Sequence, residues 1–147
     1  MRQILPLILL SIFFTPIYAD SDDSGSSYNS DDWRIAKAAK HIKKERYAKA
    51  IKQLRKALKK DKDNADAWNL LGFASRKSGD LETSADAYSK ALTLDPAHKG
   101  ALEYQGELFI TQGNIEQAQG NLAKLVELCP SGCDERSKLE QALAKLQ

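Results

Sequence analysis

The most reactive side chains of this 147-residue chain belong to its two cysteines, Cys129 and Cys133. Their C-x3-C spacing is compatible with a structural disulfide, a thiol–disulfide redox site or a soft-metal site such as copper(I). The sequence shows neither a thioredoxin-like βαβ pattern nor a nearby third ligand such as Met or His. In the oxidising compartment that the N-terminal sequence indicates, a structural disulfide is therefore the favoured interpretation.

An acidic stretch near the N-terminus has approximately the spacing of a calcium-binding loop. Asp20, Asp22, Ser24, Gly25 and Asp31 would supply the oxygen ligands and the turn. However, no helix can precede residue 20 after cleavage of a leader, and an aspartate at the last position has a shorter arm than the usual glutamate. Residues 20–32 are therefore interpreted as a disordered, acidic, Ser-rich linker.

No arrangement of residues typical of catalysis occurs in the chain. Ser/His/Asp and Cys/His sets, a glycine-rich phosphate loop and paired carboxylates in an apolar setting are all missing from the sequence. His41 and His98 have no ligand-like neighbour at metal spacing and are expected to be surface residues. The sequence predicts no enzyme, no catalytic residue, no cofactor and no metal site.

Positive charge is concentrated in one segment, although the whole chain has a formal net charge of only +2. Residues 33–62 carry 13 Lys or Arg against two acidic residues. A terminal repeat needs a polar outer face, but this does not require a single sign of charge. The segment is expected to attract lipid headgroups, an acidic protein or the acidic part of a second copy. Its central patch comprises Lys49, Lys52, Arg55, Lys56 and Lys59.

The N-terminal residues 1–19 predict export. Arg2 precedes an apolar run, and Ile17-Tyr18-Ala19 forms a cleavage site before residue 20. The run is shorter than the roughly 20 residues that cross a bilayer, which favours a signal peptide over a short membrane anchor. We expect a periplasmic or secreted protein. Exported proteins rarely meet nucleic acid, and few aromatic residues interleave with the lysines, so nucleic acid is not an expected partner.

The elements that position these groups follow from a pattern centred on residues 65–96. Apolar residues at helical spacing flank Gly79-Asp80, and Pro96 ends the stretch, which predicts a helix–turn–helix hairpin. A shift of 34 residues places Gly72 on Gly106, where the absence of a side chain permits close helix packing. Tyr88 and Leu122 are expected to fill the adjacent space. A shift in the opposite direction finds a weaker copy.

The period of 34 residues and the Trp68, Leu71-Gly72, Ala91 and Pro96 positions resemble the tetratricopeptide repeat. The resemblance implies an all-α, right-handed α-solenoid in residues 33–147. Its parts would be three helix–turn–helix repeats (31–64, 65–98 and 99–132) and a C-terminal capping helix (134–146). Three residues depart from the family pattern, namely Ser84, Gln105 and Lys62.

The resemblance further implies a non-enzymatic adaptor or scaffold that binds a peptide or helix of another protein in its concave groove. The carboxylate-clamp function of some relatives is not implied, because Ile35, Ala39, Leu70 and Tyr104 occupy the clamp positions. Two alternatives stay open: self-association between the basic head and the acidic tail, and a thiol redox or metal-handling function. The residues that resemble the groove are Ile35, Ala39, Ile42, Asn69, Leu70, Phe73, Arg76, Tyr104, Glu107 and Ile110.

Overall fold

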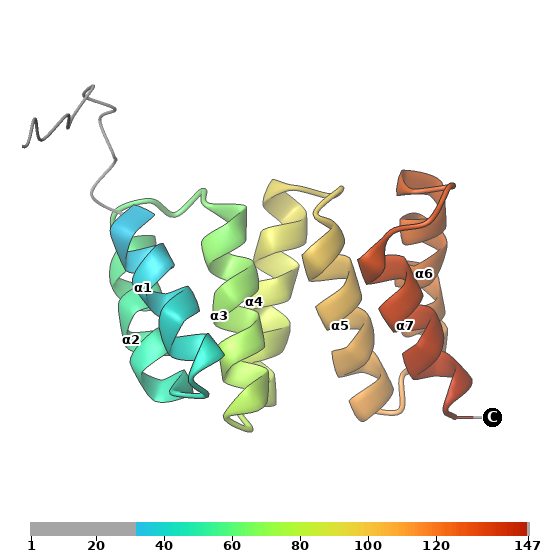
Figure 1. Cartoon of the computed structure of the whole chain (residues 1–147), viewed down its shortest axis with the longest axis horizontal. Helices are drawn as coiled ribbons and strands as arrows, with labels where there is room; N and C mark the ends of the chain where they lie inside the picture. Colours follow the sequence, from blue (N-terminus) through green and yellow to red (C-terminus); the bar gives the residue numbers. More distant parts are fainter. Residues whose placement is uncertain (1–31, 147) are drawn as a thin grey trace, which may run out of the picture.

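The computed structural model describes residues 32–146, which form seven α-helices and no β-strand (Figure 1). The predicted signal peptide and most of the acidic linker lie outside the described residues. No helix within the described range is long and apolar enough to cross a membrane. The helices are α1 (Asp32–Lys43), α2 (Tyr47–Leu58), α3 (Ala65–Lys77), α4 (Leu81–Leu94), α5 (Lys99–Thr111), α6 (Ile115–Leu128) and α7 (Asp134–Ala144).

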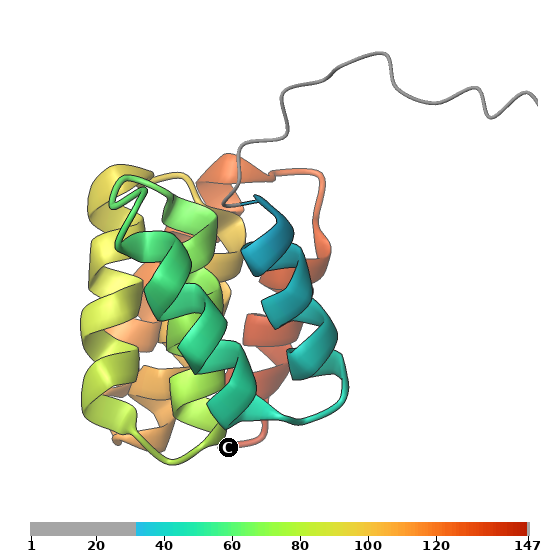
Figure 2. The ribbon, with the colours of Figure 1, turned by 90° about the vertical axis from the view of Figure 1, so that its left-hand side faces the viewer.

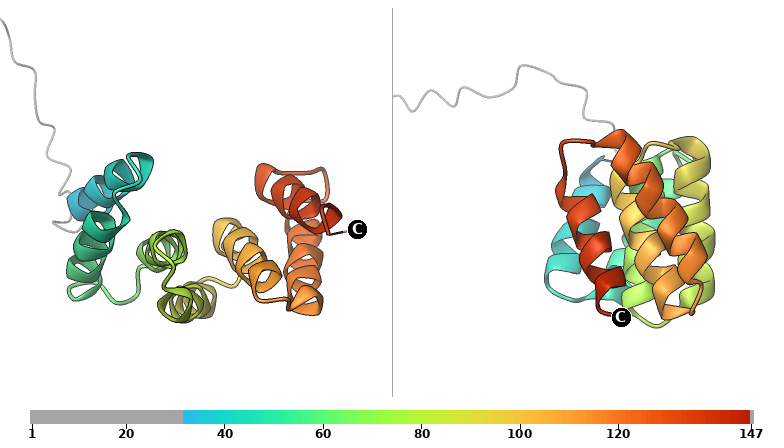
Figure 3. Two further views of the ribbon diagram at one scale, coloured as in Figure 1. Left: turned by 90° about the horizontal axis from the view of Figure 1, so that it is seen from below. Right: turned by 90° about the vertical axis from the view of Figure 1, so that its right-hand side faces the viewer.

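Consecutive helices pair into three hairpins, α1–α2, α3–α4 and α5–α6, and α7 packs against the last pair. Seen from below, the hairpins form a curved array with α1, α3, α5 and α7 along the inner side (Figure 3). The other three helices, α2, α4 and α6, form the outer side, as the end view also shows (Figure 2). The described part of the chain is therefore an all-α helical repeat solenoid.

Polar side chains cap the beginnings of three helices. Asn64 and Asp80 accept hydrogen bonds from backbone N–H groups in the first turns of α3 and α4, at 2.8 and 3.0 Å. At the start of α5, Nδ1 of His98 accepts from the backbone N–H of Ala101 at 3.1 Å, while Nε2 lies 3.0 Å from Asp66. Because only 13% of the His98 side chain is exposed, the expectation of a surface histidine is wrong.

The turns inside the hairpins use left-handed backbone conformations. Gly79 and Gly113 have φ values of 88° and 77°, which glycine adopts without steric cost. The corresponding residue of the first repeat is Glu45, which has φ 54°. A residue with a side chain loses roughly 1–2 kcal/mol in this conformation, so the first turn is the most strained of the three.

Glycines on the inner helices permit close contacts, but with different neighbours. A Cβ atom added to Gly72 would lie 2.6 Å from the ring of Tyr88, the predicted neighbour in the same hairpin. A Cβ atom added to Gly106 would meet Leu139 of α7, which supplies all three of the closest atoms. The expectation that Leu122 fills the space nearest Gly106 is therefore wrong. Leu122 instead packs against the cluster that contains Leu139.

The departures from the repeat pattern have polar partners. Ser84 is buried and donates a hydrogen bond to the carbonyl oxygen of Gly72 at 2.8 Å. Gln105 accepts a hydrogen bond from the buried Asn121 amide at 3.0 Å. The carbonyl oxygen of Lys62 accepts the indole N–H of Trp68 at 2.7 Å. These contacts let non-consensus residues remain in the stack without leaving those polar groups unpaired.

Candidate functional site

The centre of the inner face is a contact between aromatic side chains of neighbouring repeats. Phe73 of α3 and Tyr104 of α5 have ring centroids 4.9 Å apart, at an interplanar angle of 50°. Both side chains are half-buried. Such tilted aromatic pairs are attractive, and each ring here keeps part of its surface accessible. The pair therefore joins two repeats and presents apolar surface on the inner face.

An ion pair lies beside the two rings. The guanidinium group of Arg76 donates to the carboxylate of Glu107, and these side chains are 15% and 29% exposed. The Arg76 guanidinium carbon also lies 5.9 Å from the Phe73 ring centroid, within range of a cation–π interaction. We name Phe73, Arg76, Tyr104 and Glu107 the inner cluster. It combines apolar surface with one charge of each sign.

The other predicted groove residues are placed differently. Ile35, Ile42 and Leu70 pack against the core of the first two repeats, whereas Ile110 packs against the core of the last repeat. Asn69 is buried, with 8% of its surface exposed, and Ala39 is half-buried. Among the predicted residues, direct side-chain contacts between repeats thus join the four members of the inner cluster.

A buried carboxylate next to the inner cluster was missed by sequence reasoning. Glu103 is 3% exposed, and its Oε2 lies 3.7 Å from Nζ of Lys138 on α7. Burial raises the pKa of Glu103 to about 7, against the opposing attraction of the lysine. The Glu103 charge in turn raises the pKa of Lys138. No periodic signal marks this pair, because it depends on where α7 packs against α5.

The predicted basic patch lies on the outer helix of the first hairpin. Lys49, Lys52, Arg55, Lys56 and Lys59 all belong to α2, and all five are exposed. They are therefore on the opposite side of the array from the inner cluster, as Figure 3 shows for α2 and α3. Any partner of this patch approaches the protein from its outer side.

The two cysteines lie at the junction between α6 and α7. Their sulfur atoms are at bonding distance and their Cα atoms are 6.0 Å apart. Cys129 is 8% exposed, and the last helix begins directly after Cys133. A bond here would tie the capping helix to the third repeat. Within residues 32–146 no group of three or more His, Cys, Asp or Glu side chains could hold a metal ion.

Paired antiparallel helices at a fixed repeat, stacked with one helix of each pair along an inner face, define a helical-repeat protein. The sequence profile of the tetratricopeptide repeat family matches residues 35–99 and 74–132. This chain therefore belongs to the tetratricopeptide repeat family. The family and the fold expected from the 34-residue period are both confirmed.

Known proteins resemble the chain at two levels. Protein FlbA of Caulobacter vibrioides is 41% identical over 112 residues, which are 76% of this chain but 19% of that protein. The chain thus spans about a fifth of the length of this relative. The Sgt2 tetratricopeptide repeat domain of Aspergillus fumigatus is 22% identical, with a TM-score of 0.72 and 80% of each chain covered.

A third similar protein was solved with a ligand. The first tetratricopeptide repeat domain of Spaghetti (RPAP3), bound to the HSP90 peptide SRMEEVD, is 18% identical with a TM-score of 0.70. The likeness covers 79% of this chain and 92% of that domain. At these identities the two solved structures establish the fold. The fold is one that serves as a protein–protein interaction module.

Proposed function

We propose that this protein is an exported, non-enzymatic adaptor that binds a segment of another protein on its inner face. The observation that carries the proposal is the inner cluster, in which residues of α3 and α5 present apolar rings beside an ion pair. The peptide bound by the RPAP3 domain supports segment recognition by this fold. The basic patch on α2 would add electrostatic attraction during docking.

The chemistry of the inner cluster favours an apolar or amphipathic segment. Phe73 and Tyr104 offer partly exposed ring surface, and removing such surface from water favours binding. Arg76 and Glu107 already pair with each other, so neither is reserved for a free carboxylate. The partner segment would therefore place apolar side chains on the rings and polar groups at the edge.

Changing Phe73 and Tyr104 together to alanine should abolish capture of the native partner from the exporting compartment. The melting temperature should fall only slightly, because both rings are half-buried rather than core residues. Pull-down by the wild-type and variant chains, combined with thermal unfolding, measures both effects. Leu94→Ala with Val126→Ala is the control, since it removes exposed apolar side chains from the outer helices α4 and α6. Retained capture by a strongly destabilised variant would contradict the proposal.

Export and the state of the cysteines are proposed from the N-terminal sequence and from the compartment it implies. The non-reduced exported protein should begin at Asp20 and weigh two hydrogen atoms less than its reduced form. Intact-mass analysis tests both points in one measurement. A mature form that retains Arg2 would refute cleavage, and reaction of Cys129 and Cys133 with thiol reagents would refute the disulfide.

Self-association is the second candidate, favoured by the exposed cations of α2 and the acidic remainder of the chain. It predicts oligomers that dissociate as salt rises, because exposed charges are screened within about 10 Å at 0.1 M salt. Sedimentation of the purified protein at low and high salt separates this function from adaptor binding. A redox or metal-handling role would instead require free thiols at Cys129 and Cys133.

A further inference from the structure

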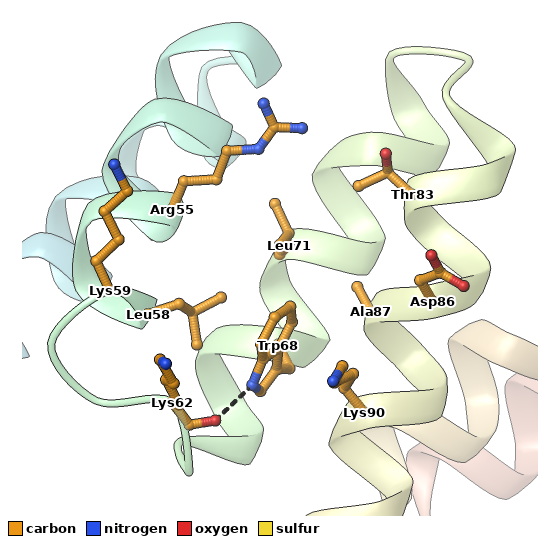
Figure 4. A pocket seen from close by; sticks show the side chains of 10 residues that line it. All are labelled: Arg55, Leu58, Lys59, Lys62, Trp68, Leu71, Thr83, Asp86, Ala87 and Lys90. Carbon is orange, nitrogen blue, oxygen red and sulfur yellow. Dashed lines mark hydrogen bonds between the residues drawn. The ribbon is translucent and has the colours of Figure 1, made fainter.

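The outer face carries a cavity of about 540 Å³ between α2 and α4 (Figure 4). Its apolar lining comes from Trp68 and Leu71 of α3, together with Leu58 and Ala87. The volume lies within the range of about 300–1,000 Å³ that is common for ligand sites in proteins. The remaining lining residues are Arg55, Lys59, Lys62, Thr83, Asp86 and Lys90.

Two adjoining cavities extend this one into an elongated depression. A cavity of about 680 Å³ shares Lys62, Trp68, Asp86 and Lys90 with it and continues along α4 to Leu94. On the other side, a cavity of about 350 Å³ shares Arg55 and Lys59 and continues along α2. We name these three connected cavities the outer track. Its length suits an extended segment better than a compact small molecule.

Trp68 presents its ring surface rather than its N–H group to the outer track. The indole N–H already donates to the carbonyl oxygen of Lys62 at 2.7 Å (Figure 4). Nζ of Lys90 lies 5.8 Å from the indole ring centroid. A ligand therefore meets an aromatic face with a cation beside it. An apolar side chain next to an acidic group matches this pair of neighbours.

Charge along the outer track has mainly one sign. Its lining includes six cationic side chains and only two carboxylates, Asp63 and Asp86. The cations converge from α2, from α4 and from the loop before α3, so a bound anion would meet several of them at once. The cationic residues are Lys52, Arg55, Lys56, Lys59, Lys62 and Lys90.

We propose that the outer track binds an acidic peptide segment of a partner protein, with one large apolar side chain seated on Trp68. This site is separate from the inner cluster and does not depend on the function proposed for it. A peptide fits better than a membrane, because the indole lies in a recess between helices that a protruding side chain can enter. A flat layer of headgroups would contact only the cationic rim.

The test uses the full chain with Trp33→Phe, which leaves Trp68 as the single reporter indole. The probe is the heptapeptide Asp-Glu-Asp-Leu-Asp-Glu-Asp, added at low salt while tryptophan fluorescence is recorded. We expect saturable binding that weakens about tenfold in the variant Arg55→Gln, Lys59→Gln, Lys90→Gln, since three ion pairs are lost. Replacing the probe leucine by serine should weaken binding severalfold, because the apolar contact is lost.

The matched control is Lys40→Gln, Lys43→Gln, Lys44→Gln, which removes three exposed cations from α1 and the turn after it. This control and the inner-face variant of Phe73 and Tyr104 should bind the probe as the parent does. Equal weakening in both charge variants, or loss only in the inner-face variant, would overturn the proposal.

Other occupants of the outer track give different results. Lysine-dependent binding of phosphatidylglycerol vesicles without probe binding would assign the outer track to lipid. Probe binding that appears only after the four aspartates between residues 20 and 31 are changed to asparagine would assign it to the chain's own segment. Association of the chain with itself that the Arg55, Lys59 and Lys90 variant abolishes, without probe binding, would assign it to a second copy. Each of these outcomes would refute a partner peptide.

Discussion

Replacing Gly72 by alanine is expected to lower the free energy of unfolding by about 2 kcal/mol, or the melting temperature by roughly 8 °C. The added Cβ would lie 2.6 Å from two ring atoms of Tyr88, which is fully buried and cannot move aside cheaply. Overpacking of this kind costs up to about 3 kcal/mol, and the better helix propensity of alanine offsets about 1 kcal/mol. Chemical denaturation of both proteins measures the difference.

Gly120→Ala provides the matched control. Gly120 lies within α6, and an added Cβ would have no neighbour within 4 Å. The same substitution should therefore stabilise the protein by up to about 1 kcal/mol, through helix propensity alone. If Gly72→Ala proved as stable as the wild type, the close approach of α3 and α4 would not depend on this glycine.

Glu103 should make the protein more stable in mild acid than at neutral pH. Its pKa is raised by burial to about 7 in the folded protein, compared with 4.5 for an exposed glutamate. Between these values the folded state binds a proton that the unfolded state does not bind, so the free energy of unfolding falls as pH rises. The loss from pH 4.5 to 7.5 should reach up to about 3 kcal/mol.

Glu103→Gln should remove most of this slope and stabilise the protein above pH 7, because an amide needs no proton to remain neutral. Denaturation midpoints between pH 4 and 8 measure the slope. Glu116→Gln, which changes an exposed carboxylate on α6, should leave it as it is in the wild type. A slope that persists in the Glu103 variant would show that another group controls the pH dependence.

The repeat architecture was predictable because its signals are local. Each hairpin needs helical spacing of apolar residues, a left-handed glycine at the turn and a small residue where two helices meet, and these recur every 34 residues. Gly79 and Gly113 adopt the left-handed conformation, and Gly72 contacts Tyr88 as expected. These contacts join residues less than 20 positions apart, so sequence spacing alone was sufficient to predict them.

The sequence also indicated which residues occupy the inner helices, but not which of them remain free to bind. Leu70 and Ile110 have the same apolar character as Phe73, yet they pack against two separate parts of the core. Helical spacing states which side of a helix a residue lies on. It does not state how far the neighbouring helix covers that side, which depends on the curvature of the stack.

Tertiary structure alone decided three features. Leu139 of α7 reaches Gly106, and the same helix covers Glu103, because the last helix packs on α5 at an angle that no periodicity encodes. The outer track requires α2 and α4 to stand at the right separation around Trp68. In each case residues distant in the sequence meet through packing between helices. Burial and the local electric field then determine their chemistry, and both are properties of the folded stack.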